Sequence, residues 1–182
     1  MRIAIYISAI ILANVLTSQF APVHIWGLLV PTGTFLIGFT FVLRDIVQMK
    51  YGKHKTYLII GAALILSALS TYMMGNGFRI VFASAISFLF SETLDTEIFT
   101  RIKGSLAKKV AISGIAGSIL DSIVFTLTAG FSINAALGQT VFKILMQGIG
   151  VLVLKTSIDR IIPGRMSGSR KMSKGGNYHE KA

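Results

Sequence analysis

Ionisable side chains inside apolar segments are the residues of this sequence that could do chemistry. Two of them are cations and four are carboxylates, and each interrupts a run rich in Phe, Leu, Ile and Val. They are Arg44, Lys143, Asp45, Glu92, Asp95 and Asp121. An ionised group within a membrane is costly and usually faces the interior of a helix bundle or a cavity. The excess of carboxylates over cations predicts relief by protonation, or by a cationic or donor-rich ligand.

The stretch 31–53 carries the densest part of this chemistry, with Arg44 and Asp45 side by side. Adjacent residues on a helix point about 100° apart, so these two are expected to contact different neighbours rather than each other. Thr40, Arg44 and Gln48 form a stripe at a spacing of four. The two charged residues are predicted to line or gate a cavity. A structural ion pair between helices is the alternative.

Polar residues elsewhere also fall on helical faces. The segment 79–100 places two carboxylates and two aromatic rings on one face, and three further segments each carry a stripe of their own. The stripes contain Phe88, Glu92, Asp95 and Phe99; Ser118, Asp121, Ser122 and Phe125; Gln139, Lys143 and Gln147; and Asn14 with Ser18. A polar stripe cannot face lipid cheaply, so the pattern predicts a polar cavity between helices.

The elements that must position these residues are apolar helices. The chain has 182 residues, of which 53% are hydrophobic and 14% are charged, against about 25% charged residues in a typical soluble domain. A membrane span needs about 20 mainly apolar residues. Six stretches qualify, at about 3–19, 31–49, 56–74, 79–100, 110–130 and 134–157. The predicted fold is an all-α membrane protein with one six-helix domain, 1–162, and a disordered basic tail, 163–182.

The basic residues predict the orientation of these helices. Lys and Arg gather in the links after the second and fourth spans and in the tail, whereas the links after the first, third and fifth spans carry almost none. The positive-inside rule therefore places both termini in the cytoplasm. The apolar segment 20–30 contains Trp26 and is expected to form an interfacial or re-entrant loop anchored by that residue.

Several function classes are excluded by what the sequence lacks. The absence of Cys removes disulfides, thiolate nucleophiles and Cys-bound metals. No Walker phosphate loop and no HExxH pair is present, and the three His residues fall in predicted loops or the tail. We therefore expect no enzyme activity, no metal and no cofactor. The net charge of +11 comes from helix ends and the tail, which does not predict nucleic-acid binding.

Four segments together resemble one known family. They are ILANVL (11–16), PTGTFLIGFTFVLRDIVQMKYGK (31–53), SETLDTEIFTRIK (91–103) and GSILDSIVF (117–125). The family is that of the queuosine-precursor transporters, also called vitamin uptake transporters. The resemblance implies a six-helix protein of the bacterial inner membrane, with a fold similar to the substrate-binding components of energy-coupling-factor transporters. It also implies import of 7-deazaguanine bases, such as the 7-cyano and 7-aminomethyl forms.

Such a base presents a ring N–H and an NH₂ that one carboxylate can accept, beside a carbonyl that needs a donor. Asp95 and Asp121 are the predicted carboxylates, with Glu92 as the alternate. The predicted donors are Arg44, Lys143 and Gln139, and the predicted stacking rings are Phe88, Phe99 and Phe125. Asn14, on the first predicted helix, is expected to line the cavity as well. Proton movement through a carboxylate is one energy source these residues allow. A substrate-binding subunit of a multicomponent importer, or a small channel, remains an alternative.

Overall fold

The computed structural model describes residues 2–161, with side chains described through residue 153. These residues form six helices and one two-stranded hairpin. In chain order they are α1 (Arg2–Gln19), β1 (Val23–Ile25), β2 (Leu28–Val30), α2 (Thr34–Tyr51), α3 (Lys53–Met73), α4 (Phe78–Arg101), α5 (Leu106–Ala129) and α6 (Ile133–Ile161). Each of the six apolar stretches is therefore a helix, which confirms the predicted helices. Residues 1–151 form one compact unit, and the predicted tail, 163–182, lies outside the described residues.

Four helices in the described part of the chain are long and apolar enough to cross a membrane. They are α1, α3, α5 and the part of α6 from Ile133 to Val153. The remaining two, α2 and α4, carry more charged residues within the same length, including Arg44, Asp45, Glu92 and Asp95. The two less apolar helices are thus the ones that carry most of the ionisable residues.

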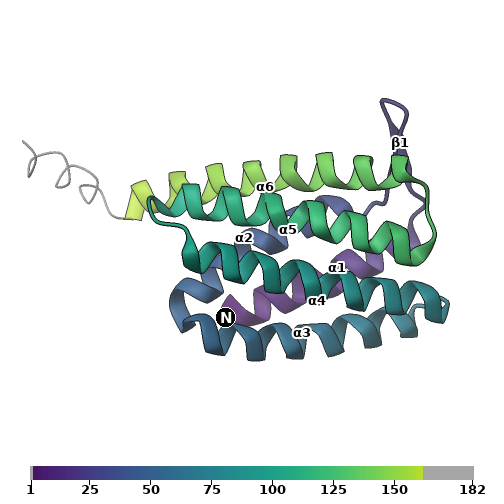
Figure 1. Cartoon of the computed structure of the whole chain (residues 1–182), viewed down its shortest axis with the longest axis horizontal. Helices are drawn as coiled ribbons and strands as arrows, with labels where there is room; N and C mark the ends of the chain where they lie inside the picture. The colour runs from purple at the N-terminus through teal and green to yellow at the C-terminus, as the bar shows by residue number, and fades with distance from the viewer. Residues whose placement is uncertain (1, 162–182) are drawn as a thin grey trace, which may run out of the picture. The chain divides into compact units, whose positions relative to one another are not determined.

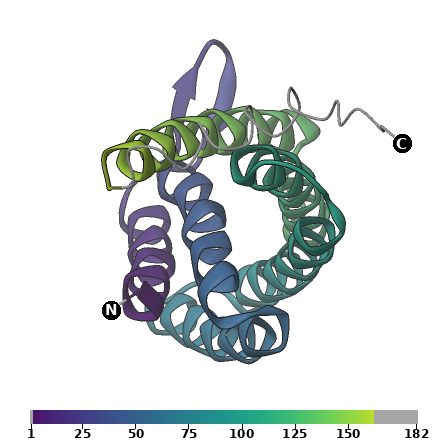
Figure 2. The same ribbon diagram turned by 90° about the vertical axis from the view of Figure 1, so that its left-hand side faces the viewer.

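Helix α2 is the central element of the compact unit formed by residues 1–151, which we call the first unit. It contacts α1, α3, α4 and α5, and the end-on view shows it inside the arc of the other helices (Figures 1 and 2). Gly38 lets α6 approach closely, because a Cβ there would lie 2.6 Å from the backbone oxygen of Lys143. Gly117 on α5 does the same, since a Cβ there would lie 3.0 Å from Phe41 and 3.1 Å from Asp95. Small residues at these crossings permit the tight packing that membrane helices depend on.

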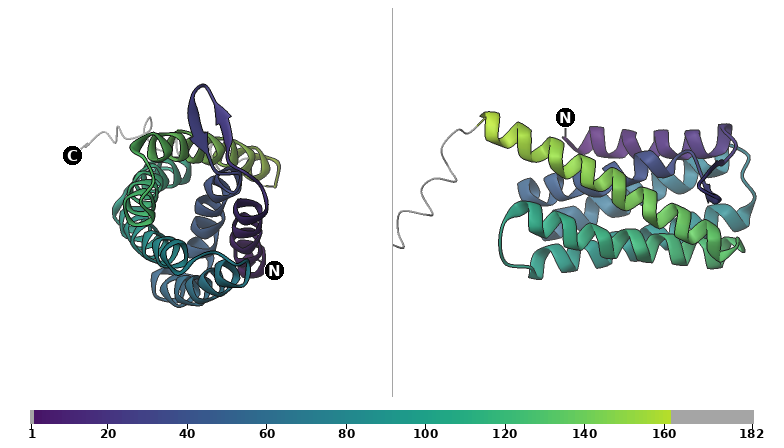
Figure 3. Two further views of the ribbon diagram at one scale, coloured as in Figure 1. Left: turned by 90° about the vertical axis from the view of Figure 1, so that its right-hand side faces the viewer. Right: turned by 90° about the horizontal axis from the view of Figure 1, so that it is seen from above.

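The segment predicted as an interfacial or re-entrant loop forms a β-hairpin, and its position in a membrane stays a prediction. Val23 pairs with Val30 and Ile25 with Leu28, and the two-residue turn is Trp26-Gly27 (Figure 3). Both turn residues have positive φ, 51° and 75°, as a type I′ turn requires. The apolar segment therefore forms two short strands joined by the Trp26-Gly27 turn. Trp26 is 87% exposed, and its role as a membrane anchor stays a prediction.

Candidate functional site

A cavity of about 260 Å³ lies within the first unit, and all six helices contribute to its wall. It occupies the half of the bundle where the hairpin and the links after α3 and α5 lie, which we call the hairpin end. Pro22, Pro31, Asn76 and Phe131 from these links line it there. The deepest lining residue along α4 is Glu92. The cavity therefore runs from the hairpin end to the middle of the bundle.

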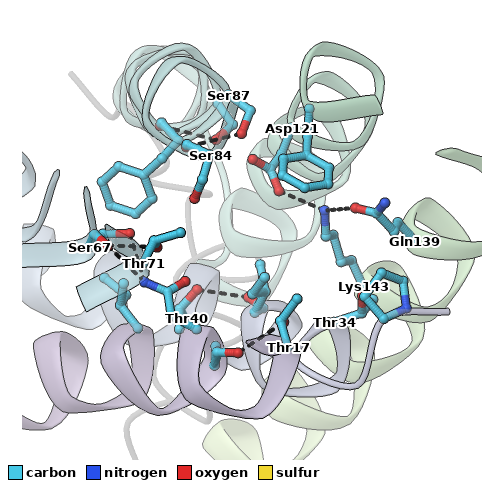
Figure 4. Close-up of a pocket in the computed structure, with 18 of the residues that line it drawn as sticks. Thr17, Thr34, Thr40, Ser67, Thr71, Ser84, Ser87, Asp121, Gln139 and Lys143 are labelled. Carbon is cyan, nitrogen blue, oxygen red and sulfur yellow. Dashed lines mark hydrogen bonds and ion pairs between the residues drawn. The ribbon is translucent and has the colours of Figure 1, made fainter. Parts of the chain in front are cut away.

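The part of the cavity wall formed by α2, α3 and α4 carries several hydroxyl groups (Figure 4). Thr40, Ser87 and Thr71 each donate to a backbone carbonyl of their own helix, at 2.8, 3.2 and 2.8 Å. Their oxygens are left as acceptors, so this wall favours a ligand that carries N–H groups. Asn14 also lines the cavity, but its amide nitrogen donates to Ser67 and Ser70 on α3.

The opposite wall holds an ion pair between α5 and α6. Lys143 Nζ lies 2.6 Å from Asp121 Oδ2, 3.1 Å from Ser122 Oγ and 3.2 Å from Gln139 Oε1 (Figure 4). These three acceptors match the three protons of the ammonium, so Lys143 has no donor left for a ligand.

The same pair leaves one oxygen of Asp121 free to bind a ligand, and one nitrogen of Gln139 without a partner among the described residues. The contact with Lys143 uses only Oδ2 of Asp121, and this side chain is 12% exposed. Because Gln139 turns its oxygen to Lys143, its amide nitrogen points elsewhere. That nitrogen is buried and has no hydrogen-bond partner among the described residues. Asp121 thus offers an acceptor to the cavity, and Gln139 carries a buried donor that can reach the cavity only if its side chain turns.

A second ionic cluster lies deeper, toward the ends of α2 and α4 that are far from the hairpin. The Arg44 guanidinium is 3.1 Å from Asp45 and 3.4 Å from Glu92, and it also pairs with Asp95. It donates to Thr96 Oγ1 at 2.7 Å as well. The side chains of the four charged residues are at most 2% exposed. The cluster holds α2 and α4 together at the end of the cavity that is far from the hairpin, which we call the cavity floor.

Arg44 and Asp45 were expected to contact different neighbours rather than each other. That expectation was wrong, because their side chains form an ion pair. Their Cα–Cβ bonds do diverge on the helix, as expected. The Arg side chain is long, however, and its planar fork offers five donors. It therefore reaches Asp45 on its own helix while it pairs with the two carboxylates of α4.

The structure brings most, but not all, of the predicted site residues to the cavity. Those that line it are Asn14, Phe88, Glu92, Asp121, Phe125, Gln139 and Lys143. Arg44, Asp45 and Asp95 lie in the deeper cluster. Phe99 does not line the cavity, and the Lys109 ammonium lies 5.7 Å from its ring centre. Asp95 lies one turn beyond Glu92, which is enough to move it from the cavity floor to the Arg44 cluster.

Sequence reasoning missed several lining residues, of which the serines of α4 and Phe131 illustrate two causes. Ser84, Ser87 and Ser91 recur on α4 at helical spacing, a signal that could have identified them. Phe131 follows the end of α5, and its ring lies 5.9 Å from that of Phe125. No periodicity marks a residue in a link, so only the fold places Phe131 at the cavity. In residues 2–153, no group of three or more His, Asp or Glu side chains is arranged to hold a metal ion.

The comparisons with known proteins concern the same part of the chain. Residues 71–157 match the profile of a family described as "putative vitamin uptake transporter". The match covers Glu92, the Asp121–Lys143 pair and Gln139. No curated protein and no solved structure is a significant match. The matched family consists of transporters rather than enzymes, and together with the apolar helices it indicates a multi-pass membrane transporter of a small molecule.

Proposed function

We propose that the chain imports a 7-deazaguanine base, a precursor of queuosine, across the bacterial inner membrane. The observation that carries the proposal is the Asp121 carboxylate, which lines the cavity, is 12% exposed and uses only Oδ2 in its contact with Lys143. A guanine-type edge presents N–H donors beside a carbonyl. Asp121 accepts from the donors, and the unpartnered Gln139 amide donates to the carbonyl once its side chain turns toward the base.

The size and lining of the cavity support a small flat ligand. Drug-sized ligands occupy pockets of about 300–1,000 Å³, and this cavity of about 260 Å³ is just below that range. Phe88 and Phe125 line it and supply faces on which a heterocycle can stack, each stack being worth about 1–3 kcal/mol in nucleic-acid sites. The ion pair of Asp121 with Lys143 is neutral as a unit, which favours an uncharged edge over an anionic nucleotide.

The arrangement of the helices in a membrane follows from the same proposal. All six helices cross the bilayer, with α2 and α4 shielded by the more apolar helices, and both termini are cytoplasmic. The hairpin end then faces away from the cytoplasm, so the cavity receives the base from outside. The Arg44 cluster lies between the cavity and the cytoplasm and acts as the closed inner gate. A fold similar to energy-coupling-factor substrate-binding components belongs to this proposal.

Complementation of uptake tests this function. The full chain is expressed in a bacterium that cannot make queuosine precursors and lacks its own importer, and 7-cyano-7-deazaguanine is supplied. Queuosine in tRNA is then measured. We expect it only when the chain is present, and Asp121→Asn should abolish it. Glu97→Gln, a carboxylate of α4 outside the cavity wall, is the matched control and should leave it unchanged.

The failing outcomes separate the alternatives. If the protein is in the membrane and no queuosine forms, even with an energising complex co-expressed, import of this base is refuted. If queuosine forms only when an energising complex is co-expressed, the chain is a substrate-binding subunit and not an autonomous importer. Entry of unrelated small solutes at similar rates would identify a channel.

A further inference from the structure

We propose that Glu92 binds the proton that drives uptake, an inference that rests on the proposed function and assigns its coupling site. Among the described residues, Glu92 is the only cavity-lining residue that forms an ion pair with Arg44. Its Oε2 lies 3.4 Å from Arg44 Nε, and its side chain is 2% exposed. A proton that enters through the cavity therefore reaches the Arg44 cluster at this carboxylate.

The charge balance around Arg44 favours the uptake of a proton. One guanidinium faces three buried carboxylates, those of Asp45, Glu92 and Asp95. If all three were ionised, two negative charges would remain without a cation. Isolated buried charge is strongly unfavourable, and carboxyl groups in such places take up protons instead.

The other helices packed around Glu92 do not supply the missing cation. From α1 it is faced by the buried hydroxyl of Tyr6, and from α5 by another carboxylate, Asp121. The ammonium of Lys143 on α6 is already occupied by Asp121. Helix α3 lines the cavity with the hydroxyl groups of Ser67 and Thr71. A proton on the cluster is the remaining way to reduce its charge.

The proton acts on the contact between α2 and α4. While Glu92 is ionised, it and Asp95 attract Arg44 and hold the two helices together beneath the cavity. When an O–H bond forms at Glu92, its Coulomb attraction to Arg44 is lost and that attachment weakens. The proton is released to the cytoplasm when the cavity opens inward, and the ionised carboxylate restores the closed contact. One proton thus accompanies each base.

The test uses the full chain in sealed liposomes with 7-cyano-7-deazaguanine as the probe. With the outside one pH unit more acidic and the membrane potential held at zero by valinomycin in equal K⁺, one proton per base supports accumulation of about tenfold inside over outside. We expect wild type to approach that ratio and to lose it when a protonophore is added. Glu92→Gln should only equalise the base, a ratio of one, because it cannot bind and release a proton. The ratio is read at steady state, so a slower variant still reports it.

Matched measurements separate this inference from the proposed function. Glu97→Gln keeps the tenfold ratio if the effect belongs to Glu92. Wild type that equalises the base regardless of the pH gradient overturns proton coupling and leaves import standing. Glu92→Gln that still accumulates the base overturns the assignment of the residue. If the base does not cross with any variant, the proposed function fails, and the inference fails with it.

A second approach applies if Glu92→Gln does not insert. Protons entering wild-type liposomes with the base are counted with an internal pH dye, and the expected stoichiometry is one. Glu92→Asp keeps a titratable group but withdraws it from Arg44, so accumulation should persist with a shifted pH profile. No proton entry, or an unshifted profile, overturns the proposal.

Discussion

Asp121→Asn is the substitution that tests the base-binding wall most directly. Asp121 Oδ2 accepts from Lys143 at 2.6 Å, so an Asn at this position turns its one oxygen to Lys143. Its NH₂ group then points to the cavity, where the N–H donors of the base need an acceptor. A hydrogen bond to a charged group contributes about 1.5–3 kcal/mol. Its loss weakens binding by about 10- to 150-fold at 1.4 kcal/mol per tenfold.

The assay is a dissociation constant for 7-cyano-7-deazaguanine, measured by titration calorimetry on the purified chain in nanodiscs. The melting temperature is recorded in parallel, because Lys143 loses its anionic partner and its burial becomes less favourable. The double variant Asp121→Asn with Lys143→Met separates the two effects. Replacing both members of a buried pair by groups of similar volume is often neutral for stability. We expect the double variant to recover the melting temperature but not the affinity.

Asp121→Asn with wild-type affinity would refute the reasoning. The carboxylate would then serve only to hold Lys143, and the base would bind elsewhere in the cavity. Recovery of affinity in the double variant would also contradict it, because the loss in the single variant would then be an effect of stability. Glu97→Gln is the control in both measurements and should change neither the affinity nor the melting temperature strongly.

Three further predictions follow from separate parts of the chain. Gln139→Leu removes the amide donor at nearly constant volume and should weaken base binding by about 1 kcal/mol, or about fivefold, in the same calorimetric assay; unchanged affinity would remove Gln139 from the site. Gly38→Ala should lower the melting temperature by an amount that corresponds to about 1–3 kcal/mol, because its methyl group meets the backbone of α6. Gly61→Ala on α3 is the control and should be neutral or stabilising, because a Cβ at this position would have no atom within 4 Å. Equal effects of Gly38→Ala and Gly61→Ala on the melting temperature would argue against close packing of α2 on α6. Lys174→Ala, in the tail outside the described residues, should leave complementation unchanged, and a strong loss of uptake would assign the tail a role in transport.

The helices could be predicted because their signal is local. A run of about 20 apolar residues buries its backbone polar groups best as a helix, whatever surrounds it. All six predicted stretches are helices for this reason. The hairpin was missed although its signal is also local. Val23, Ile25 and Val30 beside Gly27 favour short strands, but the apolar character of the segment directed the interpretation to the membrane surface.

The residue types of the candidate site could be predicted from the sequence, but the pairs that these residues form could not. The sequence by itself determined which ionisable residues lie inside apolar helices, and hence that they must face one another or a cavity. Only the tertiary structure decided that Lys143 pairs with Asp121, and that Arg44 gathers Asp45, Glu92 and Asp95. Helical spacing assigns residues to a face but does not specify how the helices rotate and slide against each other. One turn of α4 therefore separates Glu92 on the cavity wall from Asp95 beneath it, and that distinction arises from packing.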